Sequence, residues 1–147
     1  MYFGLSEDQL FFQDNVSRFL EDHASLDVIK KITEGEGKNL QKEIDSGLLN
    51  LGIHSLLVPE EYGGLDLDLL FAAAVSQSLG ENVAPFSFLG PYVMAPIALS
   101  HGASDEQKRK YLTGIAENKI KFAIGFAEFI SARNGSGCTF KNNKVNG

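Results

Sequence analysis

The sequence predicts an α+β fold in which a mainly α-helical bundle is followed by the first strands of a β domain. Apolar residues recur at helical spacing through most of the chain, and two serines open such stretches with a helix-capping pattern. After Asn118 the apolar pattern becomes that of short strands. Helices followed by strands are typical of α+β proteins or of two segregated domains. We expect a helical bundle domain over residues 1–119 and the start of a β domain over residues 120–147.

Composition excludes several classes of protein. The chain has 147 residues, of which 44% are hydrophobic, so it can bury a core without a disulfide, and the lone Cys138 could not form an internal one. The longest apolar run, residues 69–75, is too short to cross a bilayer, so a membrane protein is excluded. A net charge of −6 argues against nucleic-acid binding. No basic segment opens a secretory signal, so we expect a cytoplasmic protein.

The first helix is predicted over about residues 7–22. Ser6 and Gln9 have the spacing of a capping box, in which each side chain binds the backbone of the other. The apolar residues that follow lie on one helical face: Phe12, Val16, Phe19 and Leu20. A polar stretch over residues 33–38 is then typical of a loop.

Two further helices are predicted before residue 80. The second covers about residues 40–51 and ends where Gly52 can take a left-handed conformation. Residues 53–58 are predicted to be extended, and a turn follows at residues 60–64. The third helix, about residues 68–79, is apolar on nearly every side, so we expect it at the centre of the bundle. Four of its residues should be almost fully buried: Leu70, Phe71, Ala74 and Leu79.

The remaining elements are two helices and a β region. One helix is predicted around residues 91–100, and Ser104 with Gln107 forms a second capping box that opens the last helix. Strands are predicted over residues 122–127 and 139–140, with a hairpin turn at residues 141–144. Because the chain stops inside a strand that needs a partner, we interpret it as a piece of a longer protein.

The residues alone indicate no active site. The three histidines, His23, His54 and His101, lie far apart and lack metal-ligand spacing. A glycine-rich cluster at residues 135–137 could hold a phosphate, but a plain loop is the simpler interpretation. The adjacent Glu60 and Glu61 do not face one site, and a solvated turn explains them.

Three passages of the chain resemble the acyl-CoA dehydrogenase family. Residues 5–10, LSEDQL, resemble the opening helix of that family. Residues 47–65 contain GLLNLGI and VPEEYGGL, which are similar to its most specific passage, and residues 102–112, GASDEQKRKYL, are similar to a later helix. The resemblance implies an N-terminal helical domain, a middle β-barrel domain and a C-terminal four-helix domain. This chain would hold the first domain and the opening strands of the second.

The resemblance also implies an activity. Family members oxidise an acyl-CoA thioester between Cα and Cβ, with a hydride passing to FAD while a glutamate base removes the α-proton. That glutamate belongs to the C-terminal domain, so no catalytic residue is assigned in this chain. The implied partners are the acyl-CoA substrate, acyl-CoA dehydrogenase-like subunits in a homo- or hetero-oligomer, and an electron acceptor such as an electron-transfer flavoprotein. No metal is implied.

The segment that would contact the flavin departs from the family pattern. The family has T-E-P followed by a G-S-D loop, whereas this chain has Ala127-Glu128-Phe129 and no such loop. Ala127 therefore stands where a threonine hydroxyl would bond the flavin ring. By resemblance, the residues that would bind FAD are Ile124, Phe126, Ala127 and Glu128.

The acyl chain would lie against residues 85–92. The resemblance makes Phe86, Leu89 and Tyr92 the substrate-binding residues. Aromatic and aliphatic residues at these positions would serve a bundle core equally well, so core packing stays open as the alternative.

Three hypotheses of function follow. The first is the N-terminal part of an acyl-CoA dehydrogenase-like flavoprotein that dehydrogenates an acyl-CoA at the α,β position. The second is a non-catalytic or half-site subunit that supports a homologous partner, which the altered motif at residues 127–129 favours. The third is a free-standing helical interaction module, which would leave the strands without a purpose.

Overall fold

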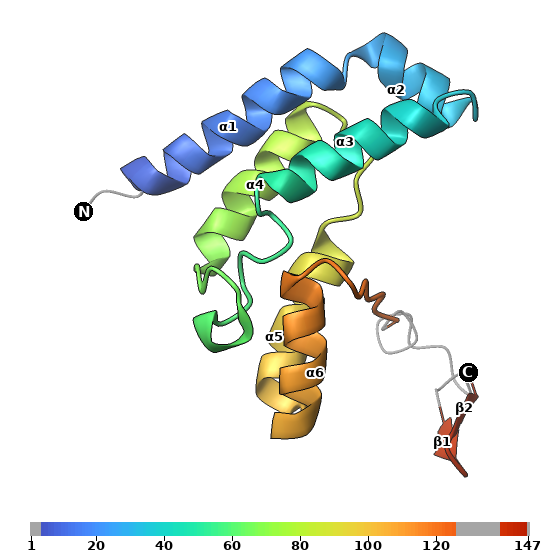
Figure 1. Cartoon of the computed structure of the whole chain (residues 1–147). Coiled ribbons are helices and arrows are strands. Elements are labelled where there is room, and N and C mark those ends of the chain that lie inside the picture. The colour runs from blue at the N-terminus through green and yellow to red at the C-terminus, as the bar shows by residue number, and fades with distance from the viewer. Residues whose placement is uncertain (1–3, 126–138, 147) are drawn as a thin grey trace, which may run out of the picture.

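A computed structural model of the chain describes residues 4–125 and 139–146 (Figure 1). Six α-helices occupy most of the first described range. They are α1 (Glu7–His23), α2 (Leu26–Thr33), α3 (Lys38–Asn50), α4 (Leu69–Glu81), α5 (Ala95–Gly102) and α6 (Asp105–Ala116). A 3-10 turn, Glu60–Tyr62, precedes α4, and a π-helical turn, Leu89–Met94, leads directly into α5.

The second described range is a β-hairpin. Strand β1 (Thr139–Lys141) pairs antiparallel with β2 (Lys144–Asn146), and Phe140 faces Val145 across the ladder. Asn142 and Asn143 form the turn with φ values of 52° and 58°. Two left-handed residues give the tight turn whose twist matches the strands, and asparagine tolerates that conformation. The predicted hairpin and the α+β class are both confirmed.

Both predicted capping boxes are present. The backbone N–H of Gln9 donates to Ser6 Oγ at 3.2 Å, and the N–H of Ser6 donates to Gln9 Oε1 at 2.9 Å. Ser104 and Gln107 make the same pair of bonds at 3.3 and 2.9 Å. These bonds satisfy backbone donors that the first turn of a helix leaves without a partner, which fixes where α1 and α6 begin.

Helices α1 and α4 lie side by side and run parallel, and α3 also packs against α1, on the same side of it as α4 (Figure 1). Gln13 Nε2 donates to the carbonyl of Ala74 at 3.4 Å, and Ser17 Oγ donates to Ser78 Oγ at 2.9 Å. Helix α5 packs against α6 as a local hairpin. The parallel pair therefore joins segments that are distant in sequence, whereas the α5–α6 pair joins neighbours.

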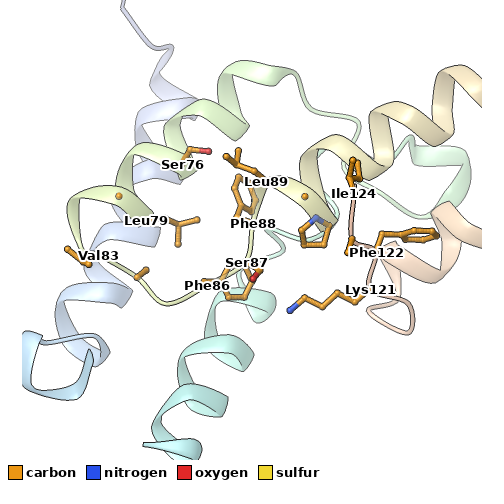
Figure 2. A pocket seen from close by; sticks show the side chains of 15 residues that line it. Ser76, Leu79, Val83, Phe86, Ser87, Phe88, Leu89, Lys121, Phe122 and Ile124 are labelled. Atoms are coloured by element: carbon orange, nitrogen blue, oxygen red, sulfur yellow. The ribbon is translucent and has the colours of Figure 1, made fainter. Parts of the chain in front are cut away.

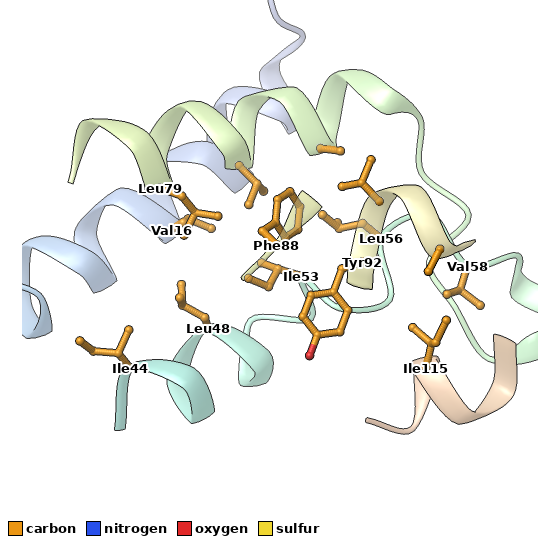
Figure 3. Packing of buried hydrophobic residues seen from close by; sticks show 14 of the residues in the cluster. Val16, Ile44, Leu48, Ile53, Leu56, Val58, Leu79, Phe88, Tyr92 and Ile115 are labelled. Atoms are coloured by element: carbon orange, nitrogen blue, oxygen red, sulfur yellow. The ribbon is translucent and has the colours of Figure 1, made fainter. Parts of the chain in front are cut away.

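The core lies between α1, α3 and α4 and continues to the start of α5 and the end of α6 (Figure 3). Its large members are almost completely shielded from solvent. They include Val16, Leu20, Ile44, Leu48, Ile53, Leu56, Val58, Val75, Tyr92, Leu112 and Ile115. Residues 53–58 enter this core although they are not extended: the N–H groups of Ser55 and Val58 donate to carbonyls three residues earlier. The predicted extended segment is wrong, because consecutive turns bury the same apolar side chains.

The predicted burial of α4 is half right. Ala74 and Leu79 are buried, but Leu70 is 54% exposed and Phe71 is only half-buried. Helix α4 presents one face to α1 and the core, while the face that carries Leu70 is exposed. An apolar surface all round a helix permits burial, but packing partners decide which part of it is covered.

Helix α2 was not predicted, although its signal is present in the sequence. Ser25 caps it by accepting a bond from the N–H of Val28 at 3.5 Å, and three half-buried apolar residues (Val28, Ile29, Ile32) lie against the core. Helix α4 also passes its predicted end, because it continues through Gly80 to Glu81.

Candidate functional site

A pocket of about 990 Å³ opens beside the C-terminal end of α4 (Figure 2). Three segments line it: the last turns of α4, residues 83–91, and residues 121–124. The lining side chains are mostly apolar, and the hydroxyls of Ser76 and Ser87 and the ammonium of Lys121 are its polar groups. A concave, largely apolar site of this volume with a few polar groups is the usual form of a small-molecule site.

One wall of the pocket follows from how α4 ends. The N–H of Ala84 donates to the carbonyl of Leu79 at 2.8 Å, and the N–H of Val83 donates to Gly80 at 3.1 Å. This is the Schellman arrangement, in which the residue after the cap is left-handed and usually glycine. Here that residue is Val83, with φ of 49° and 61% exposure. A β-branched residue in this region is strained, and its side chain lies at the pocket wall.

The segment that begins at Val83 ends in a π-helical turn over residues Leu89–Met94. The N–H of Ala95 donates to the carbonyl of Gly90, five residues earlier, and Pro91 has no N–H to donate. Phe88 before the turn is buried, while Leu89 is 58% exposed. Both side chains line the pocket, Phe88 from the core side and Leu89 from the exposed side. Turns of this π-helical kind are frequent at functional sites.

An aromatic pair forms the boundary between pocket and core. The rings of Phe86 and Tyr92 stack with centroids 5.9 Å apart and an interplanar angle of 18°. Phe86 lines the pocket, whereas Tyr92 stands behind it and is only 1% exposed. Burial raises the pKa of the Tyr92 hydroxyl, and the negative charge of Asp45 adds to the shift. Tyr92 is therefore neutral at physiological pH.

The loop before this pair is held by α3. Gln41 Nε2 donates to the carbonyl of Pro85 at 2.8 Å and to Asp45 Oδ1 at 2.7 Å. The bond to Pro85 connects α3 to the chain segment that carries Phe86, and the bond to Asp45, within α3, orients the Gln41 amide. The pocket wall is thereby positioned by a helix of the core.

The structure brings several predicted site residues together. Phe86 and Leu89, predicted to bind substrate, and Ile124, predicted to bind the cofactor, line the same pocket. Phe126, Ala127 and Glu128 lie outside the described residues. Residues 122–125, the described part of a predicted strand, form no strand. Among the described residues, the main-chain N–H and C=O groups of residues 121–125 have no main-chain partner.

Sequence reasoning missed Lys121. Its ammonium lies 5.8 Å from the centroid of Phe86 and 5.9 Å from that of Tyr92. The only signal is the alternation of Lys121, Phe122, Ala123 and Ile124, which does not show that residues 83–91 lie opposite.

The histidines take no part in this pocket. His54 Nε2 donates to the carbonyl of Ala116 at 3.0 Å, because a carbonyl oxygen can only accept. The buried Nδ1 of the same ring has no partner among the described residues. His23 stacks on Phe19 with ring centroids 4.4 Å apart.

Within residues 4–125 and 139–146, no group of histidine, cysteine or acidic side chains could hold a metal ion. In the same ranges, no helix has the length and apolar character needed to traverse a bilayer.

Comparison with known proteins gives a family match over most of the chain. Residues 6–119 match the acyl-CoA dehydrogenase N-terminal domain. A probable acyl-CoA dehydrogenase of Bacillus subtilis is 32% identical over 118 residues, covering 77% of this chain and 20% of the relative. Isovaleryl-CoA dehydrogenase of Pongo abelii is 27% identical over 127 residues, covering 85% of this chain and 30% of the relative. The chain thus spans less than a third of the length of these relatives.

Solved structures share the fold. A chain from structural work on the electron transferring flavoprotein of Acidaminococcus fermentans superposes with a TM-score of 0.68 at 22% identity, over 99% of this chain and 39% of that one. A chain of the ChsE4–ChsE5 complex of Mycobacterium tuberculosis gives a TM-score of 0.67 at 21% identity, over 100% of this chain and 39% of that one. With the family match, these likenesses show that the chain belongs to the acyl-CoA dehydrogenase family and carries its N-terminal domain.

Proposed function

We propose that this chain is the N-terminal part of an FAD-dependent acyl-CoA dehydrogenase and that the pocket beside α4 receives the acyl chain. The observation that carries the proposal is the meeting of Phe86 and Leu89 with Ile124 around one pocket. The first two were predicted to bind substrate and the third to bind the cofactor, although more than thirty residues separate them. Family membership supports the reaction type.

The lining suits an alkyl chain. Leu79, Val83, Leu89 and Ile124 offer apolar surface, and each CH₂ group removed from water contributes about 0.8 kcal/mol to binding. The role of this chain would be to bind and orient the acyl group and to exclude water from it. The base that removes the α-proton is proposed to lie in a part of the protein that this chain does not contain.

The residues described fit a flavin at the edge of the pocket. The main-chain groups of residues 121–125 lack main-chain partners among the described residues, and Ile124 offers an apolar side chain next to them. Such a segment can bond the polar edge of a flat ring and pack against its face. FAD, when bound, supplies the hydride acceptor. We propose Ile124, Phe126, Ala127 and Glu128 as the contacts in this chain.

The test uses the protein at its natural full length. We expect a flavin band at 450 nm that is bleached by an acyl-CoA, and Leu89→Asp should raise KM for that acyl-CoA about tenfold or more by placing a charge in an apolar pocket. Leu26→Asp is the matched control, since Leu26 is 76% exposed on α2 and does not line the pocket. Equal KM values for the two variants would contradict the placement of the acyl chain. Absence of flavin and of acyl-CoA binding would contradict the function.

One observation favours a second candidate, a half-site subunit beside a homologous partner. Alanine stands at position 127, where the family has a threonine hydroxyl for the flavin. The fold neighbour from the ChsE4–ChsE5 complex shows that relatives of this fold occur in complexes of two named chains. A half-site subunit would be colourless alone and gain about one flavin per pair with its partner. In a self-sufficient enzyme, Ala127→Thr should instead tighten FAD by about 0.5–1.5 kcal/mol, the contribution of one hydrogen bond.

The proposed partners follow from membership of the acyl-CoA dehydrogenase family. They are the acyl-CoA, further acyl-CoA dehydrogenase-like subunits in a homo- or hetero-oligomer, and an electron-transfer flavoprotein as acceptor. Reduced flavin that is reoxidised by such an acceptor, and not by buffer alone, would support the last of these.

A further inference from the structure

Lys121 differs from the other residues of the pocket wall. It is the one charged side chain among those that line the pocket in the described structure. Its ammonium lies over the faces of Phe86 and Tyr92, at 5.8 and 5.9 Å from the two centroids. Figure 2 shows the side chain directed from the residue 121–124 segment toward Phe86 and Ser87. Lys121 is exposed, and the attraction of the two ring faces favours this position of its ammonium at the pocket edge.

No carboxylate neutralises this charge among the described residues. Lys119, two residues earlier, pairs with Glu117 at 2.9 Å, but Lys121 has no such ion pair. Asp45 is the acidic group whose charge acts on Tyr92, and one of its oxygens already accepts a bond from Gln41. An ammonium has three N–H donors, so its contact with the two ring faces leaves donors available to a ligand. An apolar pocket with one fixed cation at its edge suits a ligand that is apolar along its length and anionic at one point.

We infer that Lys121 is a specificity-determining residue that binds an anionic oxygen group of the thioester substrate. This rests on the proposed function, since the pocket must first receive an acyl-CoA. Two parts of such a substrate carry anionic oxygens: a carboxylate at the far end of the acyl chain, and the phosphates of CoA. Either would accept charge-assisted hydrogen bonds from the ammonium.

The test compares three six-carbon thioesters on the protein at its natural full length. Adipoyl-CoA carries a terminal carboxylate and phosphates, hexanoyl-CoA carries the phosphates alone, and hexanoyl-pantetheine carries neither. Lys121→Met keeps most of the apolar stem and removes the charge. We expect it to weaken binding of an anionic ligand about three- to tenfold, between an exposed ion pair and a hydrogen bond to a charged group.

The pattern of losses identifies the anion. Weakening of adipoyl-CoA alone assigns the acyl carboxylate to Lys121. Equal weakening of both CoA esters, with hexanoyl-pantetheine unchanged, assigns a phosphate. In either case Lys121→Arg should restore most of the affinity. The matched control is Lys110→Met, because Lys110 also lies over a ring, 5.3 Å from the centroid of Tyr111, but does not line the pocket.

Two results would overturn the inference. Equal weakening of all three thioesters would mean that the stem of Lys121 only packs against the pocket, and no weakening of any would mean that its charge is not used. In both results the unaltered protein still binds thioesters, so the proposed function survives. Failure of the unaltered protein to bind any of the three would remove the proposed function and this inference together.

Discussion

The core beneath α1 and α3 and the pocket beside α4 are built from the same kinds of side chain, yet they differ in what covers them. Leu48 in the core is 0% exposed, whereas Leu89 in the pocket is 58% exposed. In the structure both leucines lie in helical turns, Leu48 in α3 and Leu89 in the π-helical turn before α5. The core leucine faces another helix, and the pocket leucine faces open space that a ligand could fill. Apolar character therefore marks surface that something must cover, and only the arrangement of elements tells whether that cover is protein or ligand.

The sharpest test truncates one leucine that other elements cover and one that they leave exposed. Leu48→Ala should lower the free energy of unfolding by about 2–5 kcal/mol, because it leaves a cavity in a closed core. Leu70→Ala should change it by only about 0.5 kcal/mol, because Leu70 is half exposed on the uncovered face of α4. Urea unfolding followed by circular dichroism measures both. A loss of 2 kcal/mol or more from Leu70→Ala would mean that this face of α4 is covered.

The stability contributed by a helix cap should not depend on whether the helix borders the core or lies elsewhere. Ser6→Ala at the start of α1 and Ser104→Ala at the start of α6 should each lower the unfolding free energy by about 0.5–2 kcal/mol. The expected losses are similar because each hydroxyl serves a backbone N–H within its own helix. Ser46→Ala, inside α3 and exposed, is the control and should be close to neutral. Differential scanning calorimetry would show the three changes together.

At the pocket wall a substitution should stabilise the chain. Val83→Gly should raise the unfolding free energy by about 0.5–1 kcal/mol, because glycine adopts the left-handed conformation without strain and little packing is lost. Val145→Gly is the matched control, since Val145 is similarly exposed but lies in β2, where glycine is unfavourable. If both variants lose stability, Val83 is not left-handed in solution.

The smallest effect at neutral pH is expected from Tyr92→Phe, and it should grow at high pH. The folded pKa of Tyr92 lies above its ordinary value of 10.0, so the native state keeps a proton that the unfolded chain releases. The resulting stability is complete below pH 10 and is lost as pH rises through the folded pKa. The variant lacks this loss, so above pH 10 it should gain stability relative to the unaltered protein. The pKa of Tyr62 is also raised, but both proteins contain it, so it cancels in the difference between their urea midpoints.

Local chemistry was predictable from the sequence. The capping boxes at Ser6 and Ser104 each span four residues, and the left-handed Gly52 and the Asn142–Asn143 turn depend on the preferences of single residues. Each of these features is determined within one helical turn or one hairpin. These features could be predicted because they depend only on residues that are close in the sequence.

What depends on distant segments was not predictable in the same way. The exposure of Leu70 is set by where α1 and α3 lie, and the burial of residues 53–58 is set by turns that no periodicity describes. The pocket requires residues 83–91 to meet residues 121–124, so Lys121 could not be placed over Phe86 from its own surroundings in the sequence. The resemblance to the family predicted three of the residues that line the pocket, Phe86, Leu89 and Ile124. It did not predict Lys121, the charged one.

The parallel packing of α1 on α4 also has a consequence in time. Their hydrogen bonds join residues about sixty positions apart, from Gln9 with Asp68 to Ser17 with Ser78. At about 5–20 residues per second, a ribosome needs roughly 3–12 s to make the chain between them. For that interval the newly made α1 has no α4 to cover its apolar face, while α5 and α6 can pair almost as soon as both exist. The start of this chain is therefore where a chaperone would act longest during synthesis.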